Sequence, residues 1–288
     1  MLQGSKAEQR KWWLYNRFKY LDSKYTAGTA NTNVISARLF ADGTITVTPN
    51  TDSYVTVQFG GGNALNIQRA EANTSVSFRY TAPSGVTEME TYIYSADLIS
   101  DIGDMSGFYP NEVDFSKATK IRRLKLGDSS SNYSNANLRT FDVRNSTLLE
   151  SIDVRNCPNL AITVNLENSP RLKEAYFDGT AITGADFADG GSLQTLHLPA
   201  TITTLTLLNL NQLTDLQVAS YANVSRLMLA NMDTDIIDPI AVLRQIPANS
   251  QVNIQGLYLE AANAAAIEDV FDLFDTMRGV TREKNADG

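Results

Sequence analysis

An apolar-x-x-apolar-x-apolar pattern recurs through the middle of the chain. The starts are about 11 residues apart, with a slip near 160–166, so one full coil takes about 22 residues. We expect the first apolar residue and those at +3 and +5 to point inward and stack on neighbouring coils. Because about 11 residues leave too little chain for a helix, the pattern predicts short β segments on both sides of each coil. The pattern fits loosely at Ala175 and Ala185, and its eight starts are Leu138, Leu149, Leu172, Ile182, Leu193, Ile202, Leu213 and Val224.

This pattern resembles the leucine-rich repeat over residues 118–235, nearer to bacterial and phage variants than to the helix-backed horseshoe. In such a coil, an Asn or Cys two or three places after the last apolar residue can bond the backbone of an adjacent coil. Asn145, Asn156, Cys157 and Asn168 lie near such positions. The pattern therefore predicts a β-solenoid over residues 111–235.

Residues 33–110 show the two-residue alternation of β-strands, broken by the turn-forming stretches GGGN and APSG. About six short strands in this length are typical of a small β-sandwich. Two alternating runs meet at Asp42 and Gly43, which predicts a β-hairpin across that pair.

Helical patterns are found at both ends of the chain. Residues 1–32 are expected to form an aromatic docking helix and a linker, and residues 236–288 a C-terminal cap. In the cap, Asp238 and Pro239 predict the start of a short helix, a strand follows, and residues 260–279 read as a longer helix. The expected fold is mostly β (α+β): an aromatic helix, a sandwich, a leucine-rich-repeat-like solenoid and a helical cap.

The predicted N-terminal helix is apolar around most of its girth. Leu14, Phe18, Leu21 and Tyr25 form one stripe, and Trp12 lies almost opposite to it. A helix with this distribution is buried between two bodies rather than laid on the surface of one. The candidate docking residues are Trp12, Trp13, Tyr15, Phe18 and Tyr20.

Charge is unevenly distributed along the chain. The net charge is −8, but residues 1–25 carry six Lys or Arg against Glu8 and Asp22, a net of +4. The acidic remainder argues against nucleic acid as the main ligand. The basic residues would meet an acidic partner or simply flank the apolar stripe.

The sequence gives no sign of membrane insertion or of disulfide bonding. No apolar run approaches the length of a membrane span, and the first 25 residues lack the core of a signal peptide. The single Cys157 excludes an internal disulfide framework. The polar end REKNADG is consistent with a fragment of a longer chain or with a frayed terminus.

No catalytic or metal-binding motif is recognisable, so we expect a protein that is not an enzyme and has no cofactor. His197 is the single histidine, and the repeat frame places it on the outer face without a recognisable nucleophile. A hydrolase that uses His197 is the least favoured of the functional hypotheses. One solenoid face is instead expected to present polar side chains that contact a protein or a glycan, or that are merely solvated. The candidate contacts are Asp153, Arg155, Glu174, Tyr176, His197 and Gln217.

The opening stretch QGSKAEQRKWWLYNRFKYLDSKYTAG resembles a segment of very large virion proteins of crAss-like phages that infect gut Bacteroidales. The stretches DFSKATKIRRLKLG and LLESIDVRNCPNL resemble the β-repeat region beside it. The resemblance implies a structural role in the virion tail or tail muzzle, with no catalytic residues. Expected partners are other virion proteins, adjacent domains of a larger chain, and a host surface protein or glycan, within a homo-oligomeric assembly. The rival hypothesis is a leucine-rich-repeat adhesin on a bacterial cell surface.

Overall fold

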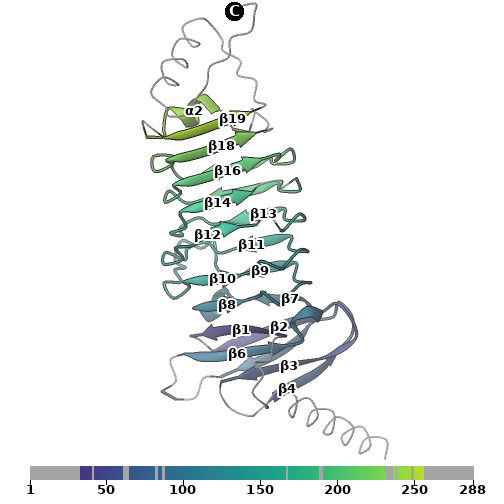
Figure 1. The fold of residues 1–288 in the computed structure, drawn as a ribbon. Coiled ribbons are helices and arrows are strands. Elements are labelled where there is room, and N and C mark those ends of the chain that lie inside the picture. Colours follow the sequence, from purple (N-terminus) through teal and green to yellow (C-terminus); the bar gives the residue numbers. More distant parts are fainter. Residues whose placement is uncertain are drawn as a thin grey trace, which may run out of the picture.

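The computed structural model describes residues 33–40, 42–60, 65–81, 84–85, 88–166, 168–187, 191–230, 236–237, 239–247 and 250–255. These residues form an elongated, mostly β column, with a two-layered β unit at one end and a β-solenoid rising from it (Figure 1). The expected N-terminal helix and the expected helix over 260–279 lie outside the described residues. The same holds for the candidate docking residues Trp12, Trp13, Tyr15, Phe18 and Tyr20.

Two antiparallel layers form the base of the column. One layer holds β1, β6, β3 and β4 in that order, and the other holds β7, β2 and β5. Alternate residues of each layer point into a shared core, as the alternation in the sequence predicts. The bounds are β1 Val34–Leu39, β2 Gly43–Pro49, β3 Ser53–Phe59, β4 Leu65–Ala70, β5 Val76–Tyr80, β6 Met89–Tyr94 and β7 Ile99–Asp104, with 3₁₀ turns at Ala96–Leu98 and Ser106–Phe108.

The hairpin predicted at Asp42 and Gly43 is wrong. Strand β1 pairs with β6 and β8, whereas β2 pairs with β5 and β7, so the chain crosses from one layer to the other at this point. A Cβ on Gly43 would lie 2.3 Å from Cε1 of Phe108. The glycine therefore makes room for a packed ring, and the sequence cannot distinguish this need from that of a tight turn.

Above the base, the chain winds as a solenoid of about six turns with one short strand on each side. Every strand pair within the solenoid is parallel, and equivalent strands begin 20–28 residues apart. This confirms the prediction of β segments on both sides. One side holds β9 Arg123–Lys125, β11 Ser151–Asp153, β13 Glu174–Tyr176, β15 Thr195–Leu198 and β17 Asp215–Val218. The other holds β8 Glu112–Asp114, β10 Thr140–Asp142, β12 Thr163–Asn165, β14 Gly184–Phe187, β16 Thr204–Leu208, β18 Arg226–Ala230 and β19 Gln251–Gln255.

The sheets run from the base into the solenoid without a break at residue 110. Strand β7 pairs with β9 to give an eight-stranded sheet, and β1 pairs with β8 to give a six-stranded sheet that ends at β10. A separate five-stranded sheet begins at β12, where the repeat spacing slips in the sequence. The base and the solenoid also share one hydrophobic core, so they are built as one column.

The inward residues stack in register from coil to coil. Leu196 is fully buried and lies between Ala175 and Leu216 on the neighbouring strands. Cys157 also occupies a fully buried inward position. This is the register that the apolar-x-x-apolar-x-apolar pattern predicts.

Asparagine side chains join successive coils at the turns. Nδ2 of Asn145 donates to the Ser116 carbonyl at 2.8 Å, and Nδ2 of Asn156 donates to the Asp128 carbonyl at 2.9 Å. Each bond satisfies a backbone carbonyl that the neighbouring strands do not reach. The predicted bonding role of these two asparagines is therefore confirmed.

The far end of the solenoid contains the short helix α2, Pro239–Leu243, between β18 and β19. It begins at Pro239, as the sequence predicts, and Val242 and Leu243 pack into the core. Strand β19 pairs with β18 on the same face. Within the described part of the chain, no helix has the length and apolar character needed to cross a membrane.

Candidate functional site

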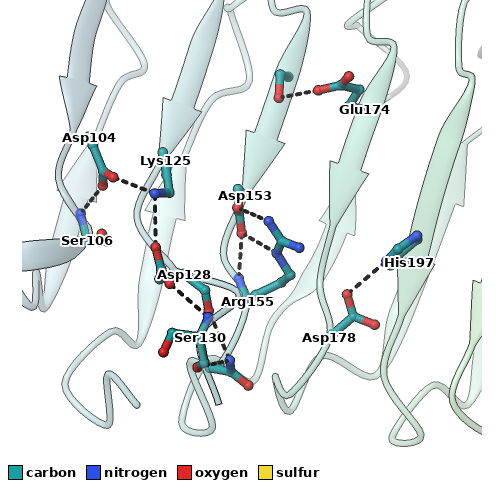
Figure 2. A network of polar contacts seen from close by, with 12 residues as sticks. Asp104, Ser106, Lys125, Asp128, Ser130, Asp153, Arg155, Glu174, Asp178 and His197 are labelled. Carbon is teal, nitrogen blue, oxygen red and sulfur yellow. Dashed lines mark hydrogen bonds and ion pairs between the residues drawn. The ribbon is translucent and has the colours of Figure 1, made fainter. Parts of the chain in front are cut away.

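The outer face of the eight-stranded sheet carries a row of polar side chains along the solenoid (Figure 2). Strand register places Asp153 beside Tyr176, Tyr176 beside His197, and His197 beside Gln217. The repeat pattern predicts this row correctly. Arg155 and Glu174, the remaining candidate contacts, belong to the same face through their bonds to Asp153 and Ser151.

Asp153 and Arg155 are bound to each other rather than presented to a partner. The Arg155 guanidinium donates to both carboxylate oxygens of Asp153, at 3.0 and 2.6 Å. Asp153 is buried, with 6% of its surface exposed, which corrects the expectation that it is an available contact. A carboxylate this buried is stabilised by the fork of donors from the guanidinium.

Tyr176 lies between two cationic or polar neighbours. The Arg155 guanidinium lies over its ring at 4.4 Å from the centroid, and the His197 ring packs against it edge to face at 5.0 Å. Both contacts are favourable for an aromatic ring with a negative face and a positive edge. They occupy a ring that a glycan would otherwise stack on, so the row is less suited to sugar binding than the sequence indicates.

His197 bridges two carboxylates on neighbouring coils. Nδ1 lies 3.2 Å from Oδ2 of Asp178, and Nε2 lies 3.1 Å from Oδ2 of Asp215. A neutral imidazole has a single N–H, so donation to both carboxylates requires the imidazolium form. The hydrogen bond from His197, helped by Gln217, lowers the pKa of Asp215 below its ordinary value.

The row continues toward the base through charged residues that the sequence reasoning missed. Nζ of Lys125 contacts Asp104, and it lies 3.0 Å from Asp128. Partial burial alone would raise the pKa of Asp104, but hydrogen bonds from Lys125 and Ser106 outweigh that effect and lower it. The repeat could have identified Lys125 in the sequence, because Lys125 lies one coil before Asp153 in the same register.

This arrangement offers no support for hydrolysis by His197. Both ring nitrogens contact carboxylates, so neither contacts a nucleophile. Burial raises the pKa of Cys157 to about 12 and keeps the thiol inside the core. Across the described ranges, no group of three or more His, Cys, Asp or Glu side chains is arranged to hold a metal ion.

A second feature is a groove of about 350 Å³ on the outer face of the six-stranded sheet, where the base meets the solenoid. It forms at β1, which pairs antiparallel with β8, while β8 pairs parallel with β10. The lining residues are Ser36, Ala37, Arg38, Glu90, Tyr92, Glu112, Val113, Asp114, Thr140 and Asp142. No local sequence pattern predicts this groove, because its residues come together only through the strand order.

Comparisons of the chain with models of known families, with curated proteins and with solved structures give no match.

Proposed function

We propose that this chain is a non-enzymatic structural protein of a bacteriophage virion, acting in the tail or tail muzzle. The observation that carries the proposal is the polar row from Asp104 to Asp215. Its side chains pair with one another across neighbouring strands at Lys125 and His197, and within one coil at Asp153 and Arg155. Ion pairs of this kind hold neighbouring coils in register and present no reactive group. A role as a scaffold fits such a face better than a role in catalysis.

The continuity of the sheets supports a role for this chain as a rigid rod. The hydrogen-bonded ladder of the eight-stranded sheet runs from β5 at the base to β17 near the far end. A shared core fixes the base on the solenoid, so the two cannot hinge freely. The resemblance of residues 1–28 to crAss-like phage virion proteins points to other virion proteins or adjacent domains as partners, within a homo-oligomeric assembly.

Electron microscopy of the purified virion tests this proposal. An antibody against the chain should label the tail in negative-stain images, and mass spectrometry of washed particles should detect its peptides in a constant ratio to the capsid protein. A control antibody against a cytoplasmic host protein should give no label. Absence of the chain from particles would remove the proposal.

The groove on the six-stranded sheet favours a second candidate, a bacterial cell-surface adhesin that contacts a host protein or glycan. Its polar lining, with Tyr92 among carboxylates, has the mixed character of a binding surface. Protease treatment of intact bacteria distinguishes the two functions. An adhesin is removed from intact cells, whereas a virion protein is found in particles and is absent from uninfected cells.

A further inference from the structure

The outer face of the six-stranded sheet changes character from apolar to acidic across its width. Four large apolar or aromatic side chains are clearly exposed among the described residues, and three of them, Tyr54, Leu65 and Ile67, lie on β3 and β4. Strand alternation puts all three on the outer side, since Val55 and Val57 point into the core. Exposed apolar side chains gathered on one face are typical of an interaction site.

One row of cross-strand neighbours connects this apolar edge to the groove. It crosses all six strands and contains Leu65, Gln58, Tyr92, Ser36, Asp114 and Asp142. At the groove end, the carboxylates Glu90, Glu112, Asp114 and Asp142 face two cations: Arg38, which lines the groove, and Arg144, which pairs with Asp142. Arg38 is itself held by Glu88 and Glu90 at 3.7 and 3.6 Å. The groove therefore has an excess of negative charge beside a tyrosine and an apolar edge.

The segment that precedes β1 has the complementary composition. Residues 1–25 carry six cationic side chains and two carboxylates, together with both tryptophans of the chain. The predicted helix over residues 10–25 would be about 24 Å long. Six strands about 4.8 Å apart also span about 24 Å, so one such helix would cover the face from the apolar edge to the groove.

We infer that the outer face of the six-stranded sheet is the docking site of this chain's own residues 1–25. Aromatic side chains of the segment cover Tyr54, Leu65 and Ile67, and its cations pair with the carboxylates of the groove. Residues 26–33 connect the segment to β1, which lies in the same sheet, and they reach about 26 Å when extended. Tethering gives the segment an effective concentration in the millimolar range, which a second copy does not normally reach.

Tryptophan fluorescence tests this inference directly, because Trp12 and Trp13 are the only tryptophans in the chain. In the full-length protein at high dilution, both should be shielded from acrylamide, and trypsin should cleave slowly at Lys6 to Lys24. Ile67→Lys and Glu112→Lys should each expose the segment and speed this cleavage about tenfold, equivalent to about 1.4 kcal/mol. The charge-matched control is Glu174→Lys, at an exposed strand glutamate of the eight-stranded sheet, which should change neither readout.

Three outcomes would overturn the inference. Tryptophans that are fully quenched in the unmodified protein show that the segment is not docked. Protection that survives both Ile67→Lys and Glu112→Lys places the segment elsewhere. Protection that disappears on dilution, with a dimer in sedimentation, assigns the face to a segment of a second copy. Circular dichroism of each variant confirms that the exposed substitutions leave the fold intact. These outcomes are independent of whether the chain is found in a virion.

Discussion

The ring of Phe108 lies where a side chain of residue 43 would begin: a Cβ on Gly43 would be 2.3 Å from Cε1 and 2.6 Å from Cζ of Phe108. This contact joins the start of β2 to the 3₁₀ turn that follows β7, at the point where the chain changes layers. Both partners are part of the junction between base and solenoid. Phe108 is buried, so its ring has little room to withdraw.

Gly43→Ala should therefore destabilise the protein by about 1–3 kcal/mol, the usual cost of overpacking. The measurement is urea unfolding followed by far-ultraviolet circular dichroism. Gly107→Ala is the control, because a Cβ there meets nothing within 4 Å. Adding Phe108→Leu should recover part of the loss in Gly43→Ala. Equal stability of the two alanine variants would contradict the packing described here.

Leu196 provides the corresponding test for the solenoid. It is fully buried between Ala175 and Leu216, so Leu196→Ala leaves a cavity and should cost about 2–5 kcal/mol. Leu208→Ala, at a partly exposed leucine at the end of β16, should cost less. Urea midpoints for the two variants decide the question, and an unchanged midpoint for Leu196→Ala would mean that the repeat register is wrong.

The contrast between these two sites shows what the sequence can predict. Leu196 belongs to a pattern repeated eight times, and a repeat reports its own register because each coil packs only on its neighbours. Gly43 is a single residue whose role depends on Phe108, 65 positions later. A contact between residues so far apart in the sequence cannot be predicted from a local pattern.

The candidate sites follow the same logic. The row through Tyr176 and His197 was predictable, because it lies in one repeat register. The burial of Asp153 was not, since it depends on how Arg155 folds over it. The groove beside Glu112 depends on β1 becoming the neighbour of β8, which is a matter of strand order. Residues far apart in sequence and outside the repeat are those that sequence reasoning missed.

Asn156 joins two coils and should be sensitive to loss of its amide donor. Nδ2 donates to the carbonyls of Asp128 and Ser130, at 2.9 and 3.2 Å. In Asn156→Asp, a carboxylate would face those two carbonyls without a proton to donate, at an expected cost of about 1–3 kcal/mol. Asp also tolerates the positive φ of 56° at this position, so the change causes no backbone strain, and the negative charge that it adds is matched in the control variant.

The matched control for that variant is Asn145→Asp, whose single bond to Ser116 is exposed to solvent. Thermal unfolding of both variants at neutral pH gives the comparison. A larger loss at Asn145 than at Asn156 would contradict the role assigned to the turn asparagines.

Acid should weaken the protein through Asp104. Its pKa is lower in the folded protein than in the unfolded chain, so its contribution to stability is present above the unfolded value of about 3.9 and is lost as the pH falls through the folded value. The difference in unfolding free energy between the unmodified protein and Asp104→Asn should thus shrink between pH 6 and about pH 2. Urea titrations at several pH values measure it.

Lys125 supplies the control, because its ammonium is one of the groups that lower the pKa of Asp104. In a Lys125→Met background, Asp104→Asn should show a smaller dependence on pH. An unchanged pH dependence in that background would assign the lowered pKa of Asp104 to the hydrogen bonds from Ser106 instead.

The reactivity of the Cys157 thiol should report how often the solenoid opens. Burial raises the pKa of its thiol from 9.0 to about 12, and its Sγ lies 3.6 Å from the Arg155 carbonyl. At pH 8, about one thiol in ten thousand would be ionised, against about one in ten for an exposed thiol. This difference slows the reaction with a thiol reagent about a thousandfold, before steric protection is counted.

As the chain has one cysteine, the signal in a maleimide or aromatic disulfide assay is unambiguous. The folded protein should react only at the rate at which the solenoid opens, and Leu196→Ala should raise that rate because it destabilises the solenoid. Rapid labelling of the unmodified protein at pH 8 would show that Cys157 is accessible without opening, and the inward register at 157 would have to be revised.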